Sequence, residues 1–496
     1  MLAAAMIGAC ALSGHAKAYA EATEAPEAVK KPNFDLDKYI GVRWYGVYLG
    51  GKKTGFAAMK LEKLHHNERP AYRTAMEMEL NIAVMGANQK LNATESTTFY
   101  ADGPMAECLS SLGAAGSFHG VVEGDKIRLT SDLGGAKTER LLPAPTNTLF
   151  DETAPLRMVI NNPKVGDSVK CPTFDATYGR MLNGEATITG VKKVPFNGVA
   201  TDVFEVLVSV VEIGMKSPML VTNEGEVLRL EVPVGAMKLI MRLEDENRAK
   251  NSTFKSVEVL KASTVKPRGK MPDLTTADSV RFTLTGIEDK ECVIENWRQK
   301  YTKTDEGYDL TVQRDTAPGQ AVAIPVKGDE FSEFLESTHF YQSENPDIIA
   351  MAKEIVGDET DSYKASEKIC QWVYNNIRKK GTATISNALE TLKSREGDCG
   401  EHAALFVGLS RAAGLPARVA SGLAYVPGFG AFGGHAWCEV YVGKWIAVDP
   451  TFGQSLADAA HIRFTLGDSD VDSYRMLTVI GKLKIKVLTG DAPAVN

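Results

Sequence analysis

Short runs of alternating apolar and polar residues dominate the chain between residues 40 and 250. The clearest pair is residues 44–49 and 52–59, which are joined by Gly50 and Gly51. This arrangement predicts a β-hairpin, because glycine tolerates the positive φ angles of a two-residue turn. Further runs of this kind lie at residues 73–85, 89–99, 125–130, 185–193, 202–213, 218–221 and 226–231. No long stretch here has the 3.6-residue period of a helix, so we expect an antiparallel sheet or an open barrel.

The pattern changes twice further along the chain. The polar residues 246–253 indicate a boundary, and shorter strands follow near residues 279–286 and 308–314. After residue 329 the apolar residues recur with a helical period, and the clearest helices are expected from Pro346 to Gly357 and over residues 365–379. The fold class that follows is α+β. We place an antiparallel β domain at 38–250, a small β domain at 251–328 and a mixed, helix-containing domain at 329–496.

The N-terminus differs from the rest of the chain. Residues 1–12 are almost wholly apolar, and Ala18-Tyr19-Ala20 fits the small-x-small pattern before a signal-peptidase site. The apolar run is shorter than the ~20 residues that span a bilayer. We therefore predict a signal peptide at 1–20, a linker at 21–37 and a periplasmic or secreted protein. A lipoprotein anchor at Cys10 and a cytoplasmic N-terminus are the alternatives.

Composition narrows the function classes. The chain has 496 residues, of which 44% are hydrophobic, and this length corresponds to two to four domains. The 56 Lys and Arg residues are outnumbered by 63 Asp and Glu residues, with no basic block, which argues against nucleic acid or an anionic membrane as the partner. No integral membrane span is expected. Seven cysteines are too few for a disulfide scaffold.

One cysteine lies where a thiol can become a nucleophile. Asp398 has the character of a helix N-cap, Cys399 begins the predicted helix, and Gly414 ends it. The unpaired N–H groups and the dipole at a helix N-terminus favour a thiolate, so we expect a lowered pKa for Cys399. Glu401 is expected to face solvent or an ion pair.

A histidine and an aspartate follow on two predicted strands. His435 stands at the start of the first strand, Gly443-Lys444 forms the turn, and Asp449 ends the returning strand. Their similar distances from the turn bring them roughly opposite each other across an antiparallel pair. A carboxylate in that position orients an imidazole, and a cysteine on an adjacent helix would complete nucleophile, base and orienting group.

These residues resemble the transglutaminase-like superfamily, here a bacterial member with an N-terminal β-rich extension. The resemblance covers about residues 330–470 and implies a papain-like fold, in which a helix bearing the cysteine packs on an antiparallel sheet. It also implies that Cys399 is the nucleophile, His435 the general base and acid, and Asp449 the orienting carboxylate. His461 and Arg463 resemble the C-terminal strand of the family and are expected to support the site. The matching segments are Asp398-Cys399, residues 409–419, residues 434–437 and residues 448–451.

Other interpretations of the same residues stay open. Cys399, His402, His435 and Cys438 have spacings that would suit tetrahedral zinc, although residues three apart on a strand point to opposite faces. A Cys399–Cys438 disulfide would silence the nucleophile. The motif formed by Gly428, Gly430 and Gly433 resembles a dinucleotide fingerprint, but no helix is predicted after it, so we expect a loop over residues 427–434.

The function expected from the sequence is that of an exported cysteine enzyme. It would act on peptide or glutamine-type amide bonds of a protein or peptide through a thioester, either as a hydrolase or as an acyltransferase. No metal and no other cofactor is expected. The alternative is a non-catalytic envelope adaptor that retains an inactive transglutaminase-like core.

Overall fold

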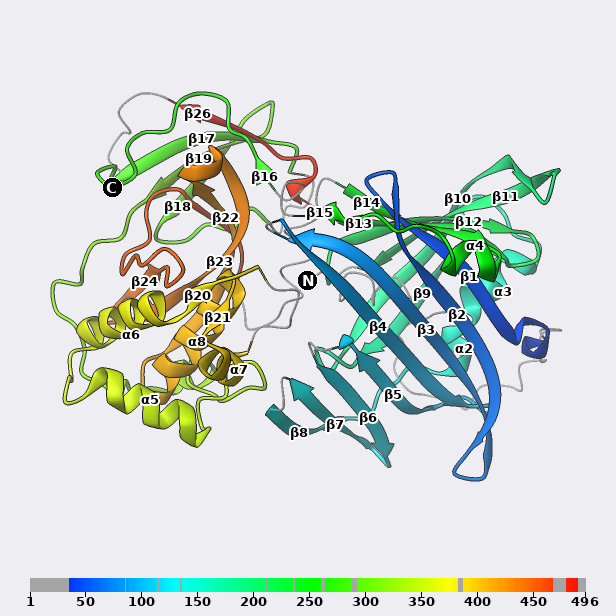
Figure 1. Cartoon of the computed structure of the whole chain (residues 1–496), viewed down its shortest axis with the longest axis horizontal. Helices are drawn as coiled ribbons and strands as arrows, with labels where there is room; N and C mark the ends of the chain where they lie inside the picture. The colour runs from blue at the N-terminus through cyan, green and yellow to red at the C-terminus, as the bar shows by residue number, and fades with distance from the viewer. Residues whose placement is uncertain are drawn as a thin grey trace, which may run out of the picture. The chain divides into compact units, whose positions relative to one another are not determined.

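The computed structural model describes residues 35–84, 86–113, 116–133, 136–210, 212–234, 237–259, 264–287, 292–381, 387–466 and 479–488. The predicted signal peptide at 1–20, including Cys10, lies outside the described residues, as does the predicted linker up to residue 34. The chain divides into two compact units, which meet in the sequence between Val257 and Glu258 (Figure 1). The domain limits expected from the sequence stay predictions.

The N-terminal unit is built on one antiparallel sheet, as the alternating pattern predicts. Its strands follow the order β8-β7-β6-β5-β4-β3-β2-β1-β14-β13-β12-β11-β10-β9, so nearly every strand pairs with its neighbour in sequence. The strands are β1 (Gly41–Leu49), β2 (Lys52–His66), β3 (Arg69–Val84), β4 (Ala87–Tyr100), β5 (Met105–Ser111), β6 (Ser117–Glu123), β7 (Lys126–Leu133), β8 (Ala136–Pro143), β9 (Ser168–Asp175), β10 (Arg180–Phe196), β11 (Val199–Val210), β12 (Met215–Thr222), β13 (Val227–Val234) and β14 (Met237–Glu244).

Short helices accompany this sheet. They are η1 (Leu36–Tyr39), α2 (Leu149–Glu152), α3 (Ala154–Ile160) and α4 (Glu246–Lys250). Helix α2 begins with a capping box, in which the Thr148 hydroxyl accepts from the Asp151 N–H and the Asp151 carboxylate accepts from the Thr148 N–H. Helix α3 has Pro155 in its first turn, where proline costs no hydrogen bond.

The first hairpin matches its prediction. Gly50 and Gly51 have φ angles of +55° and +77°, which suit the two-residue turn between β1 and β2. Strand register then aligns side chains across the sheet, because Tyr45 pairs with Ala57 and Arg43 pairs with Met59. Tyr45, at 2% exposure, lies on the covered face of this sheet.

The C-terminal unit holds two further sheets. One follows the order β18-β19-β17-β26, and the other follows β16-β23-β22-β25 with β24 paired to β23. The strands expected near 279–286 and 308–314 are present as β17 and β19. The strands are β16 (Thr264–Val265), β17 (Ser279–Thr285), β18 (Gln299–Lys303), β19 (Tyr308–Gln313), β22 (Ala417–Val426), β23 (Ala431–Tyr441), β24 (Trp445–Val448), β25 (His461–Leu466) and β26 (Lys484–Leu488), beside the short parallel pair β20 (Arg378–Lys379) and β21 (Glu396–Gly397).

One hydrophobic core joins these two sheets. Phe282 of β17 meets Phe432 of β23 edge-on, with ring centroids 5.5 Å apart, and both rings are fully buried. Leu423 and Ile462 from the second sheet belong to the same cluster. The burial of these apolar side chains stabilises the small sheet and the helix-containing region together.

Helix α8 (Cys399–Ala412) is the central helix of this unit. Its core-facing side chains include Leu405, Phe406 and Leu409, each with no exposed surface. A helix that is apolar on most sides is normally covered on most sides. It packs against β22 and β23 and against the surrounding helices, which are α5 (Pro346–Val356), α6 (Ser362–Asn376) and α7 (Ala388–Ser394) (Figure 1).

None of the helices in the described ranges has the length and hydrophobicity needed to cross a bilayer.

The glycine-rich loop expected at 427–434 is shorter than predicted, since η6 (Pro427–Phe429) is followed closely by β23 from Ala431. Gly433 and Gly434 therefore pair in a sheet, and no helix follows the glycine motif, as expected.

Candidate active site

The start of α8 is held by a capping box. The Asp398 carboxylate accepts a hydrogen bond from the Gly400 N–H at 2.9 Å, and the Glu401 carboxylate accepts one from the Asp398 N–H at 2.8 Å. The expectation that Asp398 caps this helix is confirmed. The expectation that Glu401 faces solvent is wrong, because its side chain turns back onto the cap and is only 5% exposed, whereas the ion pair stays a prediction. The Asp-x-x-Glu spacing is the local signal for this arrangement.

Cys399 is a partly exposed residue at this helix start. The lowered pKa expected from the helix dipole is wrong. Burial raises the pKa of the thiol well above its ordinary value, and the carboxyl groups of Asp398 and Glu401 add to this shift. The backbone N–H of Ala436 opposes it by hydrogen bonding to the sulfur. Burial, together with the carboxyl groups of the cap, therefore outweighs the dipole and favours the neutral thiol.

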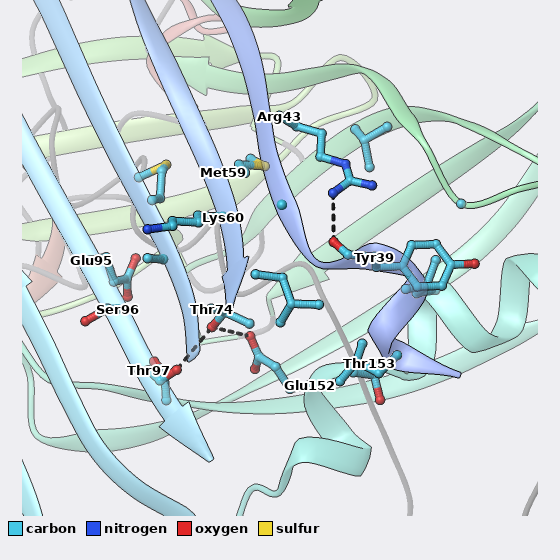
Figure 2. Close-up of a pocket in the computed structure, with 18 of the residues that line it drawn as sticks. Tyr39, Arg43, Met59, Lys60, Thr74, Glu95, Ser96, Thr97, Glu152 and Thr153 are labelled. Carbon is cyan, nitrogen blue, oxygen red and sulfur yellow. Dashed lines mark hydrogen bonds between the residues drawn. The ribbon is translucent and has the colours of Figure 1, made fainter. Parts of the chain in front are cut away.

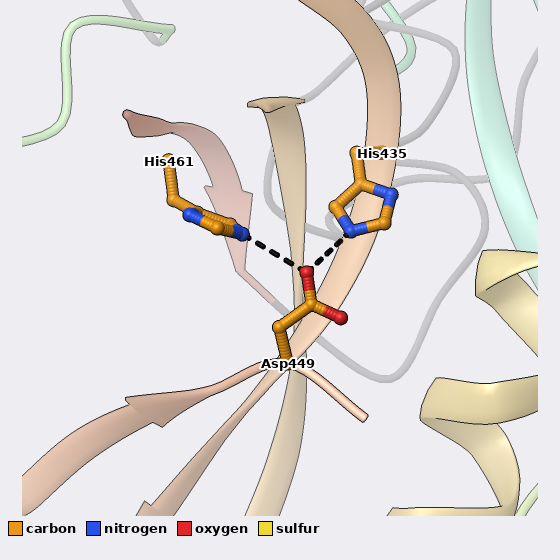
Figure 3. A group of neighbouring side chains, drawn as sticks. All are labelled: His435, Asp449 and His461. Atoms are coloured by element: carbon orange, nitrogen blue, oxygen red, sulfur yellow. Dashed lines mark hydrogen bonds and ion pairs between the residues drawn. The ribbon is translucent and has the colours of Figure 1, made fainter. Parts of the chain in front are cut away.

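His435 lies on β23, one residue before the Ala436 N–H that contacts the thiol. Cys438 of β23 pairs with Val448 of β24, so Asp449 emerges just past the paired segment. From there it reaches His435, whose Nε2 donates to Asp449 Oδ2 at 2.7 Å (Figure 3). The opposite ring nitrogen of His435, Nδ1, has no hydrogen-bond partner among the residues that the structure describes. Phe452 stacks on the ring, with centroids 4.6 Å apart.

The structure thus brings His435 and Asp449 into direct contact and places the Cys399 sulfur against the backbone N–H of Ala436, the residue after His435. No hydrogen bond joins the Cys399 sulfur to the His435 ring within the described part of the chain.

A second histidine shares the same carboxylate oxygen. His461 of β25 donates from Nε2 to Asp449 Oδ2 at 3.0 Å, and its Nδ1 lies 3.0 Å from Asp458 Oδ1 (Figure 3). The other oxygen of Asp449 accepts from the N–H groups of Thr451 at 2.7 Å and Phe452 at 3.0 Å. Each oxygen of the buried Asp449 carboxylate therefore has two donors.

Electrostatics follow from these contacts. Burial alone would raise the pKa of Asp449, but the rings of His435 and His461 hold it well below its ordinary value. The two carboxylates raise the pKa of His461 to about 9 against the effect of burial. His461 accordingly lowers the pKa of Asp458 to about 2. At neutral pH, His461 is an imidazolium between two carboxylates.

The cluster also contains the atoms of a possible metal site. Ligand atoms of His435, Asp449 and His461 lie within 4.8 Å of one another. Both Nε2 atoms approach the carboxylate at hydrogen-bonding distance, which requires a proton between nitrogen and oxygen. Those nitrogens then have no lone pair for a cation, so this geometry fits a hydrogen-bonded triad better than a metal centre.

The zinc and disulfide alternatives are contradicted by the placement of their residues. Cys438 donates its thiol to the Ala403 carbonyl at 3.6 Å, and His402 donates from Nδ1 to the Asp398 carbonyl at 2.6 Å. Across the described residues, the four side chains proposed for zinc do not form one ligand set. Cys399 and Cys438 are both free thiols.

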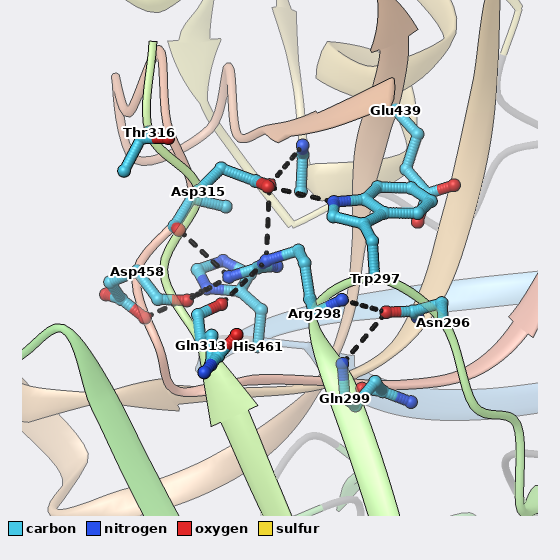
Figure 4. Close-up of polar contacts among 12 residues, drawn as sticks. Asn296, Trp297, Arg298, Gln299, Gln313, Asp315, Thr316, Glu439, Asp458 and His461 are labelled. Atoms are coloured by element: carbon cyan, nitrogen blue, oxygen red, sulfur yellow. Dashed lines mark hydrogen bonds and ion pairs between the residues drawn. The ribbon is translucent and has the colours of Figure 1, made fainter. Parts of the chain in front are cut away.

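Residues far upstream hold the strands that carry the site. Buried Arg298 donates from Nη2 to the carbonyls of Ala457 at 2.9 Å and Asp458 at 2.6 Å (Figure 4). Asp315 accepts the Ala447 N–H at 2.8 Å, two residues before Asp449. Arg298 and Asp315 lie 3.3 Å apart as an ion pair. Neither residue is predicted from the sequence, because no local spacing connects it to the motif.

The two residues expected to support the site have different contacts. His461 touches Asp449 directly, whereas Arg463 donates to Glu439 at 2.6 Å. Glu439 also accepts from Arg418 at 2.9 Å, so these three residues join β22, β23 and β25. Asp458 was not identified from the sequence, although its position three residues before His461 was a usable signal.

The comparisons with known proteins identify a family for this region. Residues 349–450 match the model of the transglutaminase-like superfamily, and this range contains Cys399, His435 and Asp449 but not His461. No match was found among curated protein sequences.

Several solved structures are similar to parts of the chain. A Cytophaga hutchinsonii protein provisionally described as a cysteine protease is 19% identical, with 44% of this chain and 83% of that chain covered and a TM-score of 0.29. A β-barrel-like protein of a domain of unknown function from Brucella abortus is 12% identical, with 41% and 95% covered and a TM-score of 0.30. A Parabacteroides distasonis protein provisionally described as a protease is 11% identical, with 78% and 66% covered and a TM-score of 0.19. Residues 349–450 of this chain form a transglutaminase-like domain, which follows a strand-rich N-terminal region.

Proposed function

We propose that this protein is an exported thiol enzyme that cleaves or transfers the acyl group of peptide or glutamine-type amides. The observation that carries the proposal is the pairing of His435 with a buried, fully bonded Asp449, next to the thiol at the start of α8. A carboxylate in that position fixes which imidazole nitrogen bears the proton. The proposed catalytic residues are Cys399, His435 and Asp449.

The chemistry begins from a neutral thiol. Nδ1 of His435 accepts the proton of Cys399 as the sulfur attacks the amide carbonyl, because the proton on Nε2 is held by Asp449. The imidazolium then gives the proton to the departing ammonia or amine. A thioester between Cys399 and the acyl group remains. Water releases an acid from it, or a second amine forms a new amide, and His435 returns the proton to sulfur.

Asp449 and His461 act through His435. The negative charge of Asp449 stabilises the imidazolium that forms during attack. His461 supplies a second donor to the same oxygen, and Asp458 keeps that imidazole in place. His461 is therefore a positioning residue, which limits the orientations that Asp449 can adopt.

The proposed substrate class is inferred from the domain family, and the proposed location is inferred from the N-terminal sequence pattern. Transglutaminase-like domains are usually cysteine hydrolases or acyltransferases, which favours a peptide or protein substrate. The predicted signal peptide at residues 1–20 supports a periplasmic or secreted location, with Cys10 as the alternative lipid anchor.

A direct assay tests the proposal. The purified protein is incubated with a library of glutamine-containing peptides, with and without an added primary amine, and the products are analysed by mass spectrometry. Cleavage of the peptide bond gives smaller peptides, deamidation adds about one mass unit, and transfer replaces the ammonia of glutamine with the amine. Cys399→Ala should abolish every product, whereas Cys108→Ala, a change in the other unit, should not.

The outcome separates the two functions that the sequence leaves open. Product formation that persists in Cys399→Ala would contradict the thiol mechanism. A phenotype of the intact cell that is lost on deletion of the gene but retained by Cys399→Ala would favour the adaptor.

A further inference from the structure

A pocket in the N-terminal unit has a composition unlike that of an ordinary sheet core. It has a volume of about 200 Å³ and lies between the covered face of β1–β4 and the helices α2 and α3 (Figure 2). For comparison, roughly 150 Å³ admits benzene in an engineered protein cavity. The pocket is therefore large enough for a small organic molecule.

The walls of the pocket are mainly apolar. Strand register aligns Met59 of β2 with Arg43 of β1 and with Met76 of β3, so one face of three strands forms the floor. Other apolar lining residues include Leu36, Tyr45, Leu61, Leu156 and Val227. Such a surface suits a hydrocarbon chain or a ring.

One carboxyl group stands among these apolar side chains. Glu95 occupies a position on β4 that alternates with the buried Ala93 and Phe99 and therefore points to the covered face. Its Oε2 atom is buried and has no hydrogen-bond partner among the described residues. A buried polar atom without a hydrogen-bond partner destabilises the folded protein, so a ligand that supplies a donor would be favoured here.

Neighbouring acids increase the cost of this arrangement. Burial, together with the carboxyl groups of Asp175 and Glu152, raises the pKa of Glu95 well above its ordinary value. Glu152 also lines the pocket, and Thr74 donates to it at 3.5 Å. A negative charge on Glu95 is therefore disfavoured in these surroundings, and a cation placed beside the carboxyl group would favour it.

The basic side chains that line the pocket are occupied elsewhere. Arg43 donates to Glu226 at 3.0 Å and to the Tyr39 carbonyl at 2.7 Å. Lys60 pairs with Glu62 at 2.5 Å. Within the described residues, no basic side chain forms an ion pair with Glu95, so a cation for this carboxylate would have to come from a ligand.

We propose that this pocket binds a small primary amine with an apolar body, whose ammonium group pairs with Glu95 while its hydrocarbon part lies on Met59 and Met76. An ammonium donor satisfies the buried oxygen and offsets the charge of the acidic end in one step. The apolar walls account for the rest of the molecule. This binding site is separate from the proposed active site, and neither proposal depends on the other.

Titration calorimetry on the full chain at pH 7 tests the proposal with n-hexylamine as the probe. We expect saturable binding with one site per chain. Hexan-1-ol and hexanoate have the same hydrocarbon chain with a neutral or an anionic head, and each should bind at least tenfold more weakly. The absence of saturable binding by hexylamine, or equal binding of hexanoate, would overturn the proposal.

Two variants locate the site. Glu95→Gln keeps the size of the side chain and should weaken hexylamine binding at least tenfold, whereas Glu77→Gln, on the exposed face of β3, should leave it unchanged. Met59→Trp fills the pocket, retains Glu95 and should also abolish binding. Thermal unfolding of each variant shows that it is folded. Wild-type affinity in both folded pocket variants would place the amine elsewhere and refute the assignment.

Discussion

At the scale of single residues, the candidate site depends on how charges are balanced around buried carboxylates. Asp449 is satisfied by two imidazoles and two backbone N–H groups, and the cationic form of His461 balances Asp449 and Asp458. Cys399 shows the opposite situation, since burial and the carboxyl groups of Asp398 and Glu401 disfavour its thiolate. The proposed mechanism therefore needs a base to take the thiol proton as the sulfur attacks.

The balance around His461 predicts a dependence of stability on pH. Its folded pKa of about 9 lies above the ordinary value of 6.5. Its stabilising contribution is therefore complete below pH 6.5 and is lost as the pH rises through 9. At 1.36 kcal/mol per pKa unit, His461 contributes at most about 3 kcal/mol to the free energy of unfolding.

Urea unfolding of His461→Ala measures this effect. The variant should be less stable than the wild type by about 3 kcal/mol at pH 6, and the difference should shrink toward pH 10. Tryptophan fluorescence is a suitable signal, because four of the five tryptophans lie at Trp297 or beyond. His119→Ala, a change at a partly exposed surface histidine, is the control. A difference that stays constant with pH would contradict the assigned charge of His461.

The negative charge at the start of α8 predicts the reactivity of the thiol. Asp398→Asn removes a charge that raises the pKa of Cys399 and keeps a side chain that caps helices well. We therefore expect iodoacetamide to alkylate Cys399 several-fold faster in this variant at pH 7.5, measured by peptide mass spectrometry. The equivalent cap change Asp245→Asn in α4 should have no effect. An unchanged rate in Asp398→Asn would show that the cap does not control the thiol.

At the scale of elements, the position of β25 depends on a close approach to β22. Gly422 pairs with Arg463, and a Cβ atom on Gly422 would lie 2.0 Å from the Ile462 carbonyl oxygen. Only a residue without a side chain permits this distance. Since β25 carries His461, the strand contact and the contact to Asp449 are formed together.

Substitution of this glycine tests the role of the strand contact. Gly422→Ala should lower the free energy of unfolding by about 1–3 kcal/mol, the usual range for overpacking. It should also reduce any activity of the C-terminal unit, because β25 must shift. Gly428→Ala is the matched control, since nothing lies within 4 Å of its added Cβ atom. Equal stability of the two variants in urea would show that β22 and β25 can separate without cost.

At the scale of the whole molecule, each unit has its own core, and the C-terminal unit is joined by contacts between distant parts of the chain. Strand β17 pairs with β19 on one side and with β26 on the other, near residue 488. Arg298 and Asp315 connect the small sheet to the segments around Asp449 and Asp458. The small sheet therefore contributes contacts that hold the candidate site in place.

Removal of the buried cation should show this coupling. Arg298→Met leaves Asp315 buried and unpaired and should cost about 3–5 kcal/mol of stability. Lys193→Met breaks the exposed pair with Asp202 and should change stability by less than about 1 kcal/mol. Urea unfolding of both variants gives the comparison. A similar small effect of both changes would mean that the Arg298 contacts do not hold the segment at 457–458.

The sequence by itself determined the features that depend on residues close together in the chain. The Gly50-Gly51 turn, the Asp398 cap and the stop at Gly414 need only neighbours within about one turn, and Gly414 has the expected positive φ of +79°. Alternation then defined the antiparallel sheet, and the motif around Cys399, His435 and Asp449 located the candidate site.

Only the tertiary structure decided which distant groups share one environment. It placed His461 on Asp449 and connected Arg298 to the loop of Asp458, and it left Oε2 of Glu95 without a hydrogen-bond partner among the described residues. It also reversed the expected shift of the Cys399 pKa. The helix start, which the sequence reveals, favours a lowered pKa, but desolvation and neighbouring charges outweigh the helix dipole. Burial and the proximity of charges depend on chain segments that meet only after folding, so no local sequence pattern predicts them.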